Sequence, residues 1–289
     1  MERPFLRAKW RSLAMISYEV DPALLGPLVP AGTELDRFGG RCFVSVVGFM
    51  FLDVRVLGVA VPLHTRFEEV NLRFYVRRDV DGETRRGVVF VRELVPLPAV
   101  ALVARLVYGE RYSALPMRHR DGDALVSYEW RTRGRWEGLE LAPAGDWAAA
   151  EPGSEEEFVT EHYWGYAAGR RGTVEYRVAH PRWRVSGARS SRVVCDAERL
   201  YGGRFAAVLD GSPTSAFLAD GSPVEVNVEI YPTGWDLAPG HTLRLSLQEA
   251  DVPHLMASVP EALASVGATL SIYHDSSHDS QLVIPVRNG

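Results

Sequence analysis

The stretch Phe67-Glu68-Glu69-Val70-Asn71-Leu72-Arg73-Phe74-Tyr75 decides the fold, because apolar and polar residues alternate along it. Successive side chains of a β-strand point to opposite faces, so every second residue shares a face. One face then carries Val70, Leu72 and Phe74. The other face carries four polar side chains: Glu69, Asn71, Arg73 and Tyr75. The alternation predicts a β-strand with one apolar and one polar face.

The polar face of this strand has two interpretations. In an ordinary antiparallel sheet such a face points to solvent. In a barrel it can line the interior, where buried charges must be paired or serve a ligand. Glu69 and Arg73 are two alternate steps apart, close enough for an ion pair. The pair Arg92-Glu93 ends the apolar run 88–91, and it forms either a simple sheet rim or a second wall of the same pocket.

Runs rich in β-branched and aromatic residues recur along the chain and predict further strands. They cover residues 42–57, 66–76, 87–95, 124–131, 173–179, 215–218, 224–231 and 243–247. Asp-Gly pairs at 81–82 and 121–122 predict tight turns between strands. We therefore predict a mainly β protein, a closed antiparallel β-barrel with a few peripheral helices. Closure removes unpaired strand edges and can enclose a ligand cavity.

Three helices are predicted between the strands. Asp21-Pro22 places an N-cap before a proline at the first helical position, which predicts a helix over 23–28. Residues 98–108 are apolar on all sides and are followed by glycine, a signal that ends helices. A capping box at Ser154-Glu-Glu-Glu157 predicts a helix that continues to His162.

Composition and charge exclude several classes of function. The net charge of −5 provides no general phosphate-binding surface, so we expect no nucleic-acid partner. Cys42 and Cys195 are too few for a disulfide framework or a metal cluster and predict thiols in a reducing cytosol. The longest apolar stretch, 44–63, is interrupted by two charges and a proline, so we expect no membrane span and no membrane partner. No apolar segment follows the basic N-terminus, so no signal peptide and a cytoplasmic location are expected.

Two clusters combine histidine with aromatic residues. Residues 160–166 contain His162 and Tyr163, and residues 180–183 contain His180 beside a tryptophan. A histidine at the end of a helix is commonly stabilised by the helix dipole, which is the simpler interpretation of His162. The alternative is that His162, Tyr163 and His180 contact a small-molecule substrate.

The sequence resembles the YqjF-like family of uncharacterised proteins, within the acetoacetate decarboxylase-like superfamily. The resemblance covers residues 3–226 and implies one β-barrel domain with an internal cavity over about 1–226. The residues that carry it are Arg3-Pro4-Phe5-Leu6 with Trp10, Val20-Asp21-Pro22, Phe49-Met50-Phe51-Leu52, the stretch 67–77, Arg92-Glu93-Leu94-Val95-Pro96, 154–166, His180-Pro181-Arg182-Trp183 and 215–222.

The resemblance also implies a site, with one departure. The decarboxylase uses a lysine downstream of an Arg-Glu strand, whereas residues 92–98 here contain none and Lys9 is the one lysine of the chain. Since a Schiff base needs a desolvated lysine, we expect lysine-independent chemistry on a small carbonyl or carboxylate metabolite, without a cofactor. Glu69 and Glu93 are the candidate acid/base catalysts. The candidate substrate-binding residues are Asn71, Arg73, Tyr75, Arg92, His162, Tyr163 and His180, with Arg73 or Arg92 holding a carboxylate.

A second resemblance covers the C-terminal segment, residues 227–289. It is similar to the last strands of the jelly-roll domain of X-prolyl dipeptidyl peptidases and cocaine-esterase-like hydrolases, which predicts a β-rich extension. The chain lacks a Gly-x-Ser-x-Gly nucleophile elbow, so hydrolase activity is not expected. His274 and His278 have no evident third ligand, so no metal site is expected. A non-catalytic ligand-binding protein, an interaction module built on this segment and a homo-oligomer stay open.

Overall fold

The computed structural model describes residues 6–220 except 108, 170–171, 179 and 181. The chain divides into two compact units, 1–222 and 223–289, and the described residues belong to the first. The strands predicted at 224–231 and 243–247, His274, His278 and the proposed C-terminal extension lie outside the described residues.

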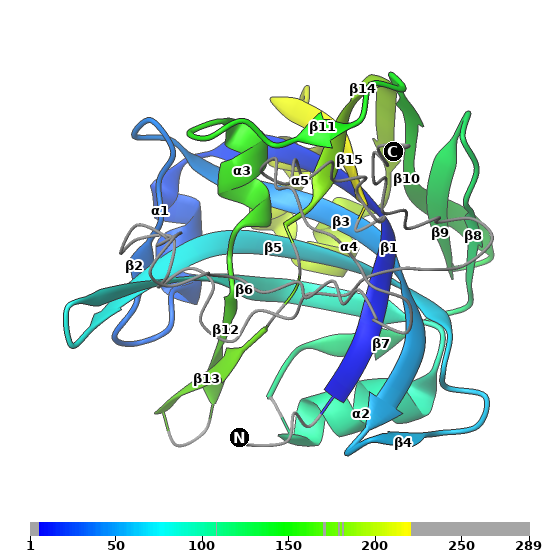
Figure 1. Cartoon of the computed structure of the whole chain (residues 1–289), viewed down its shortest axis with the longest axis horizontal. Helices are drawn as coiled ribbons and strands as arrows, with labels where there is room; N and C mark the ends of the chain where they lie inside the picture. The colour runs from blue at the N-terminus through cyan, green and yellow to red at the C-terminus, as the bar shows by residue number, and fades with distance from the viewer. Residues whose placement is uncertain (1–5, 108, 170–171, 179, 181, 221–289) are drawn as a thin grey trace, which may run out of the picture. The chain divides into compact units, whose positions relative to one another are not determined.

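The described chain is mainly β, as predicted (Figure 1). Its strands are β1 (Leu6–Val20), β2 (Glu34–Leu35), β3 (Cys42–Val56), β4 (Val59–Ala60), β5 (Phe67–Val80), β6 (Glu83–Val95), β7 (Tyr112–Ala114), β8 (Met117–Arg120), β9 (Val126–Thr132), β10 (Arg135–Pro143), β11 (Ala148–Ala149), β12 (Trp164–Gly169), β13 (Gly172–Arg177), β14 (Arg184–Val194) and β15 (Ser215–Asp220). The helices are α1 (Pro22–Leu25), the 3-10 turn η1 (Gly26–Leu28), α2 (Pro98–Val107), α3 (Glu155–Thr160), α4 (Ala197–Tyr201) and α5 (Gly203–Leu209).

All strands belong to one sheet, in the order β13-β12-β6-β5-β3-β1-β15-β14-β10-β9-β8. Short strands attach beside this path: β2 on β5, β4 on β3, β7 on β6 and β11 on β14. Most pairs are antiparallel, but β6 pairs in parallel with both β7 and β12. The purely antiparallel sheet predicted from the sequence is therefore wrong, and the pairings of the described strands do not close the sheet into a barrel.

The central strands β1, β3, β5 and β6 are covered on both faces. Figure 1 shows α3 in front of these strands and α4 and α5 behind them. On the face of α4 and α5, Leu72 of β5 belongs to a core that includes Phe205 of α5 and Tyr128 of β9. On the face of α3, Tyr75 of β5 packs against Phe158 with ring centroids 5.3 Å apart. The polar face of β5 therefore points toward α3, away from the larger apolar core.

The predicted helices form with corrected ends. Asp21 caps α1 by accepting from the Ala23 N–H at 2.8 Å, as the sequence predicts. Ser154 caps α3, but the Glu157 carboxylate accepts from the Gly153 N–H, one residue before the expected partner. Helix α3 ends at Thr160, so His162 lies beyond it. Helices α4 and α5 were not predicted, and neither were the strands β1, β8, β10, β12 and β14.

Gly48 of β3 is required by the packing of the core. A Cβ added there would lie 2.5 Å from Cδ2 of Tyr128, closer than real side chains approach. We expect Gly48→Ala to lower the free energy of unfolding by about 1–3 kcal/mol, because the buried ring has to shift. Chemical denaturation measures this.

Gly187 of β14 provides the matched control for Gly48. A Cβ at Gly187 meets nothing within 4 Å, so Gly187→Ala should change the unfolding free energy by no more than about 0.5 kcal/mol. Equal effects of the two substitutions would contradict the packing described for Gly48.

Candidate functional site

The polar face of β5 is buried, so the solvent-facing interpretation is excluded. Glu69 and Glu93 are each 2% exposed, and Asn71 is buried as well. Antiparallel pairing sets Asn71 directly opposite Glu93, which places Glu93 on the same face. The register of β5 and β6 shifts between Leu72 and Arg73, because β6 has one extra residue there, Val91. Two neighbouring strands thus supply two carboxyl groups to one interior region.

Tyrosines from two other strands hold this region together. The Tyr112 hydroxyl of β7 donates to Glu69 Oε2 at 2.8 Å, and Asn71 Nδ2 donates to Glu69 Oε1 at 3.1 Å. The Tyr176 hydroxyl of β13 donates to Glu110 Oε1 at 2.8 Å. Glu69, Glu93 and Glu110 are named the carboxyl cluster below.

Gly165 of β12 lets Tyr176 reach the carboxyl cluster. It pairs directly with Tyr176, and a Cβ at this position would lie 2.2 Å from the phenol ring. Any other residue would push the ring away from Glu110. The absence of a side chain at Gly165 of β12 therefore makes room for the Tyr176 ring of β13.

Burial controls the protonation of the carboxyl cluster. It raises the pKa of Glu69 to about 7, against the opposing hydrogen bonds of Asn71 and Tyr112. It also raises the pKa of Glu110 to about 7. The pKa of Glu93 is held well above its ordinary value by burial and by the charges of Glu110 and Glu69. The cluster therefore retains protons at neutral pH and contains both a proton donor and a proton acceptor.

Arg73 does not form the ion pair with Glu69 that the sequence predicted. Its NH2 group donates to the Val159 carbonyl at 3.1 Å, and both oxygens of Glu69 already accept from Asn71 and Tyr112. The positive charge of Arg73 nevertheless lowers the pKa of Glu69. The nearby end of α3 explains why spacing along the strand was a poor guide, since its Val159 carbonyl accepts from the Arg73 guanidinium.

On this face, one buried polar atom of each of three β5 and β6 residues has no hydrogen-bond partner in the described structure. They are Asn71 Oδ1, Arg73 Nε and Glu93 Oε2. Buried polar atoms are nearly always hydrogen bonded, so such a group suits a small polar ligand. The set contains a donor on a cation and acceptors on an amide and a carboxyl group.

Arg92 lies on the opposite face from the carboxyl cluster. It pairs with Leu72 across β5 and β6, and its NH1 group donates to Ser113 Oγ at 2.9 Å. The structure therefore does not bring Arg92 together with Glu69 or Arg73.

Tyr75 and His162 form a second buried group on the same face. The Tyr75 and Ser45 hydroxyls are 2.7 Å apart, and the His162 ring lies 4.8 Å from the Tyr75 ring. His162 Nε2 is 3.1 Å from Asp36 Oδ2, which also accepts from Arg86 at 2.7 Å. Burial lowers the pKa of His162 to about 4 despite the Asp36 carboxylate. His162 is thus a neutral core side chain at pH 7.

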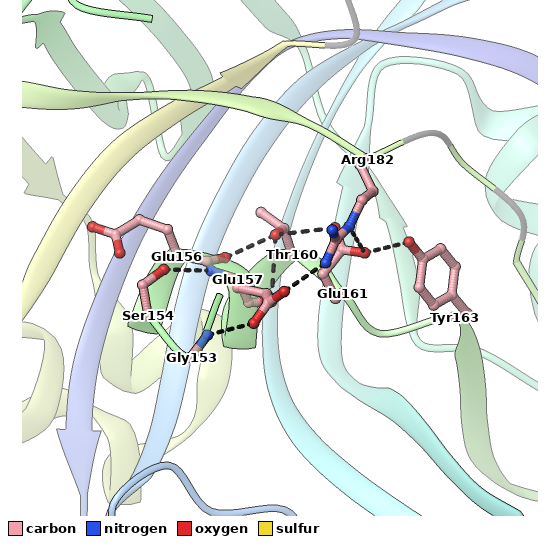
Figure 2. A network of polar contacts seen from close by, with 8 residues as sticks. All are labelled: Gly153, Ser154, Glu156, Glu157, Thr160, Glu161, Tyr163 and Arg182. Atoms are coloured by element: carbon pink, nitrogen blue, oxygen red, sulfur yellow. Dashed lines mark hydrogen bonds and ion pairs between the residues drawn. The ribbon is translucent and has the colours of Figure 1, made fainter. Parts of the chain in front are cut away.

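Tyr163 and His180 belong to a third, aromatic group. Their rings stack at 4.5 Å, and His180 stacks on Trp183 at 5.2 Å. Figure 2 shows the polar contacts beside it, where Tyr163 donates to Glu161 and Arg182 reaches both Glu161 and Glu157. These contacts attach the segment after β13 to α3. The ring contacts described for His180 are with Tyr163, Trp183 and Trp10, within this aromatic group.

The sequence did not identify Glu110, Tyr112 and Tyr176 as candidate site residues. Tyr112 reaches Glu93 through the parallel pairing of β6 and β7, and Tyr176 arrives through β12. Parallel pairs join segments that are far apart in sequence and leave no turn signal between them. The glycine at 165, unusual inside a strand, was the one available indication of close packing.

The described residues include no group of three His, Cys, Asp or Glu side chains arranged to hold a metal ion. None of the described helices has the length and apolar character that crossing a bilayer requires. A hollow of about 330 Å³ lies away from the carboxyl cluster, beside β8 and β9, where Arg118, His119 and Glu129 contribute to its lining.

Comparison with known proteins gives a family and a fold. The model of the DUF2071 family, described as an uncharacterized conserved protein, matches residues 7–223. The uncharacterized protein YqjF of Bacillus subtilis is 26% identical over 202 residues, which are 68% of this chain and 82% of that protein. The predicted YqjF-like resemblance is confirmed. The family match ends before the segment 227–289, so it gives no support to the jelly-roll resemblance.

Two solved structures show the fold. Acetoacetate decarboxylase from Legionella pneumophila is similar with a TM-score of 0.50 and 13% identity, over 76% of this chain and 85% of that chain. The enduracididine biosynthesis enzyme MppR, complexed with pyruvate, is similar with a TM-score of 0.53 and 12% identity, over 76% and 86%. The chain therefore has an acetoacetate decarboxylase-like fold.

The raised pKa values predict a pH-dependent stability. The folded protein binds a proton at Glu69 more tightly than the unfolded chain, so this contribution is complete below pH 4.5 and is lost as pH rises through about 7. Glu69→Gln removes the titration. Between pH 4.5 and 8 its unfolding free energy should gain about 2–3 kcal/mol relative to wild type.

Urea unfolding at a series of pH values measures this difference. Glu151→Gln removes an exposed carboxylate and should leave the pH profile of the wild type unchanged. A Glu69→Gln profile parallel to that of wild type would show that Glu69 is ionised in the folded protein.

His162 provides a second pH prediction of opposite sign. Because its folded pKa is lowered to about 4, its contribution to stability is present above pH 6.5 and is lost as pH falls toward 4. In NMR spectra, the His162 imidazole, assigned from its absence in His162→Gln, should remain neutral at pH 5.5. A titration midpoint near 6.5 would place this ring in contact with solvent.

Proposed function

The chain belongs to the DUF2071 family, and from this premise we propose that it binds a small carbonyl or carboxylate compound at the carboxyl cluster and catalyses a proton transfer there. The observation that carries the proposal is the burial of Glu69, Glu93 and Glu110 in one region with raised pKa values. Carboxyl groups with a pKa near the working pH are effective general acids and bases.

The two candidate catalysts take different roles. Burial and the charges of Glu110 and Glu69 raise the pKa of Glu93, so it suits the general acid that donates to a carbonyl oxygen. Glu69, with a pKa of about 7, suits the base that removes a proton from the adjacent carbon. The step moves one proton onto oxygen and one from carbon to Glu69, which gives an enol without gain or loss of electrons.

Arg73 and Asn71 suit the binding of the substrate. Arg73 Nε and Asn71 Oδ1 are buried without partners on the face that carries both catalysts. A guanidinium is well matched to a carboxylate, and the amide oxygen can accept from a hydroxyl. The complex of the similar enzyme MppR contains pyruvate, which supports a small 2-oxo acid as the first compound to test.

Schiff-base chemistry is not part of the proposal. Lys9 is the one lysine of the chain, its side chain is 61% exposed, and its Nζ lies 2.8 Å from Asp53. An exposed, ion-paired ammonium is not the desolvated amine that Schiff-base chemistry needs.

The alternative function is ligand binding without catalysis. The mutual hydrogen bonds of Glu69, Asn71 and Tyr112 favour it, because they already satisfy much of the site. An interaction module based on residues 227–289, a closed barrel with an internal cavity, and a domain boundary near 226 also stay proposals. The interaction module and the closed barrel are supported by the sequence resemblances, and the boundary is supported as well by the division of the chain after residue 222.

Proton exchange tests the proposal directly. In D2O the full chain should exchange the methyl protons of pyruvate or a larger 2-oxo acid, which proton NMR follows. Glu69→Gln and Glu93→Gln should each slow exchange about 100-fold or more, the usual size of an acid/base contribution. Arg73→Ala should mainly raise KM, because it removes an anchor of the substrate.

The control and the outcomes separate the hypotheses. Glu151→Gln should exchange at the wild-type rate. A rise in melting temperature with the oxo acid but no exchange would favour non-catalytic binding. Exchange that persists in both glutamate variants would remove Glu69 and Glu93 from the mechanism.

A further inference from the structure

Apolar side chains are exposed together at one end of the sheet. The described structure has ten exposed large apolar residues, and all except Trp136 and Val194 belong to this end. The eight are Leu6, Leu57, Val59, Val61, Leu63, Leu102, Val103 and Leu106, called the end patch below. On an ordinary protein surface the exposed apolar residues are scattered, whereas here they cluster at one end.

Strand register brings these residues to the same end. Leu6 at the start of β1 pairs with Val56 at the end of β3, which pairs with Val59 of β4. β5 begins and β6 ends at this edge too, since Phe51 pairs with Phe67, and Val70 with Leu94. Helix α2 directly follows β6. Figure 1 shows α2, β4 and the start of β1 together at the lower end of the molecule.

Two leucines of the end patch adopt a backbone conformation that leucine rarely takes. Leu57 has φ 52° and Leu63 has φ 64°, and they are 64% and 89% exposed. Leu57 and Gly58 both have positive φ at the two-residue turn between β3 and β4, where Asn-Gly is strongly preferred. These leucines fill no core and fit their turns poorly. The fold alone therefore does not explain them.

Helix α2 independently indicates that a partner covers this end of the sheet when the protein functions. Ala101 and Ala104 face the core, whereas Leu102, Val103 and Leu106 are exposed on its other side. A helix that is apolar all round is normally buried on all sides.

The charges at this end of the sheet indicate which kind of partner would cover it. The segments 6–10, 53–66 and 98–107 contain five cations (Arg7, Lys9, Arg55, Arg66 and Arg105) and one carboxylate, Asp53. The chain as a whole carries −5, so this end has the opposite sign. A second copy docked on the same patch would bring like charges together. An anionic partner is favoured instead.

We propose that the end patch binds peripherally to an anionic lipid surface. Leucines on a turn and on an outer helix face enter the headgroup region without needing a matching pocket, and the flanking arginines attract the anionic lipids. The prediction of no membrane partner was based on the lack of a spanning segment in the sequence. A surface contact needs none. The inference is separate from the proposed function and does not depend on it.

Vesicle sedimentation of the full chain tests the proposal. Wild type should sediment with phosphatidylcholine vesicles that contain 30% phosphatidylserine, and at least tenfold less with pure phosphatidylcholine. Raising the salt should release it. The variant Leu57→Asn with Leu63→Asn should lose at least tenfold in binding yet fold normally, because asparagine accepts positive φ better than leucine.

Val194→Ser is the matched control, since it removes an exposed apolar side chain elsewhere and should bind as wild type. Unchanged sedimentation of the double asparagine variant, or no binding of wild type to anionic vesicles, would overturn the proposal. A wild-type dimer that the double variant converts to a monomer, without vesicle binding in either, would also overturn it and assign the patch to self-association.

Discussion

The exclusion of water from the polar face of β5 is the constraint on which the candidate site depends. Carboxyl groups are strongly hydrated, and their burial favours the protonated form unless cations are close. Here the neighbours of Glu69 are an amide and a phenol, and Arg73 is engaged by the Val159 carbonyl. Few positive charges contact these carboxyl groups directly. Burial by the surrounding protein therefore sets the pKa values of the cluster. Every part of the fold that covers this face contributes to its chemistry.

β5 connects the two halves of the structure because its two faces meet different neighbours. Val70, Leu72 and Phe74 belong to the apolar core with α5 and β9, where stability is concentrated. The residues at the alternate positions of β5 face α3, β7 and the wall of the candidate site that β6 forms. A single strand thus fixes the distance between the core and the polar region.

Local sequence patterns predicted the elements that have local causes. The alternation along 67–75 identified β5 and the residues that share its faces, and the Asp21 and Ser154 caps identified two helix starts. The alternation could not decide between solvent and interior, since both give the same pattern. It also could not show that Arg92 follows Leu72 to the other face while Glu93 follows Asn71, because this depends on register. Glu110 and Tyr176 join through parallel neighbours, which no local signal announces.

The carboxyl cluster is assembled from segments between residues 69 and 176, so it forms only when parts of the chain that are far apart in sequence have come together. In an unfolded chain its three glutamates are hydrated and have lost their protons at neutral pH. Their higher proton affinity after burial means that this part of the protein takes up hydrogen ions as it folds. The heat of folding then includes the ionisation enthalpy of whichever buffer supplies those ions.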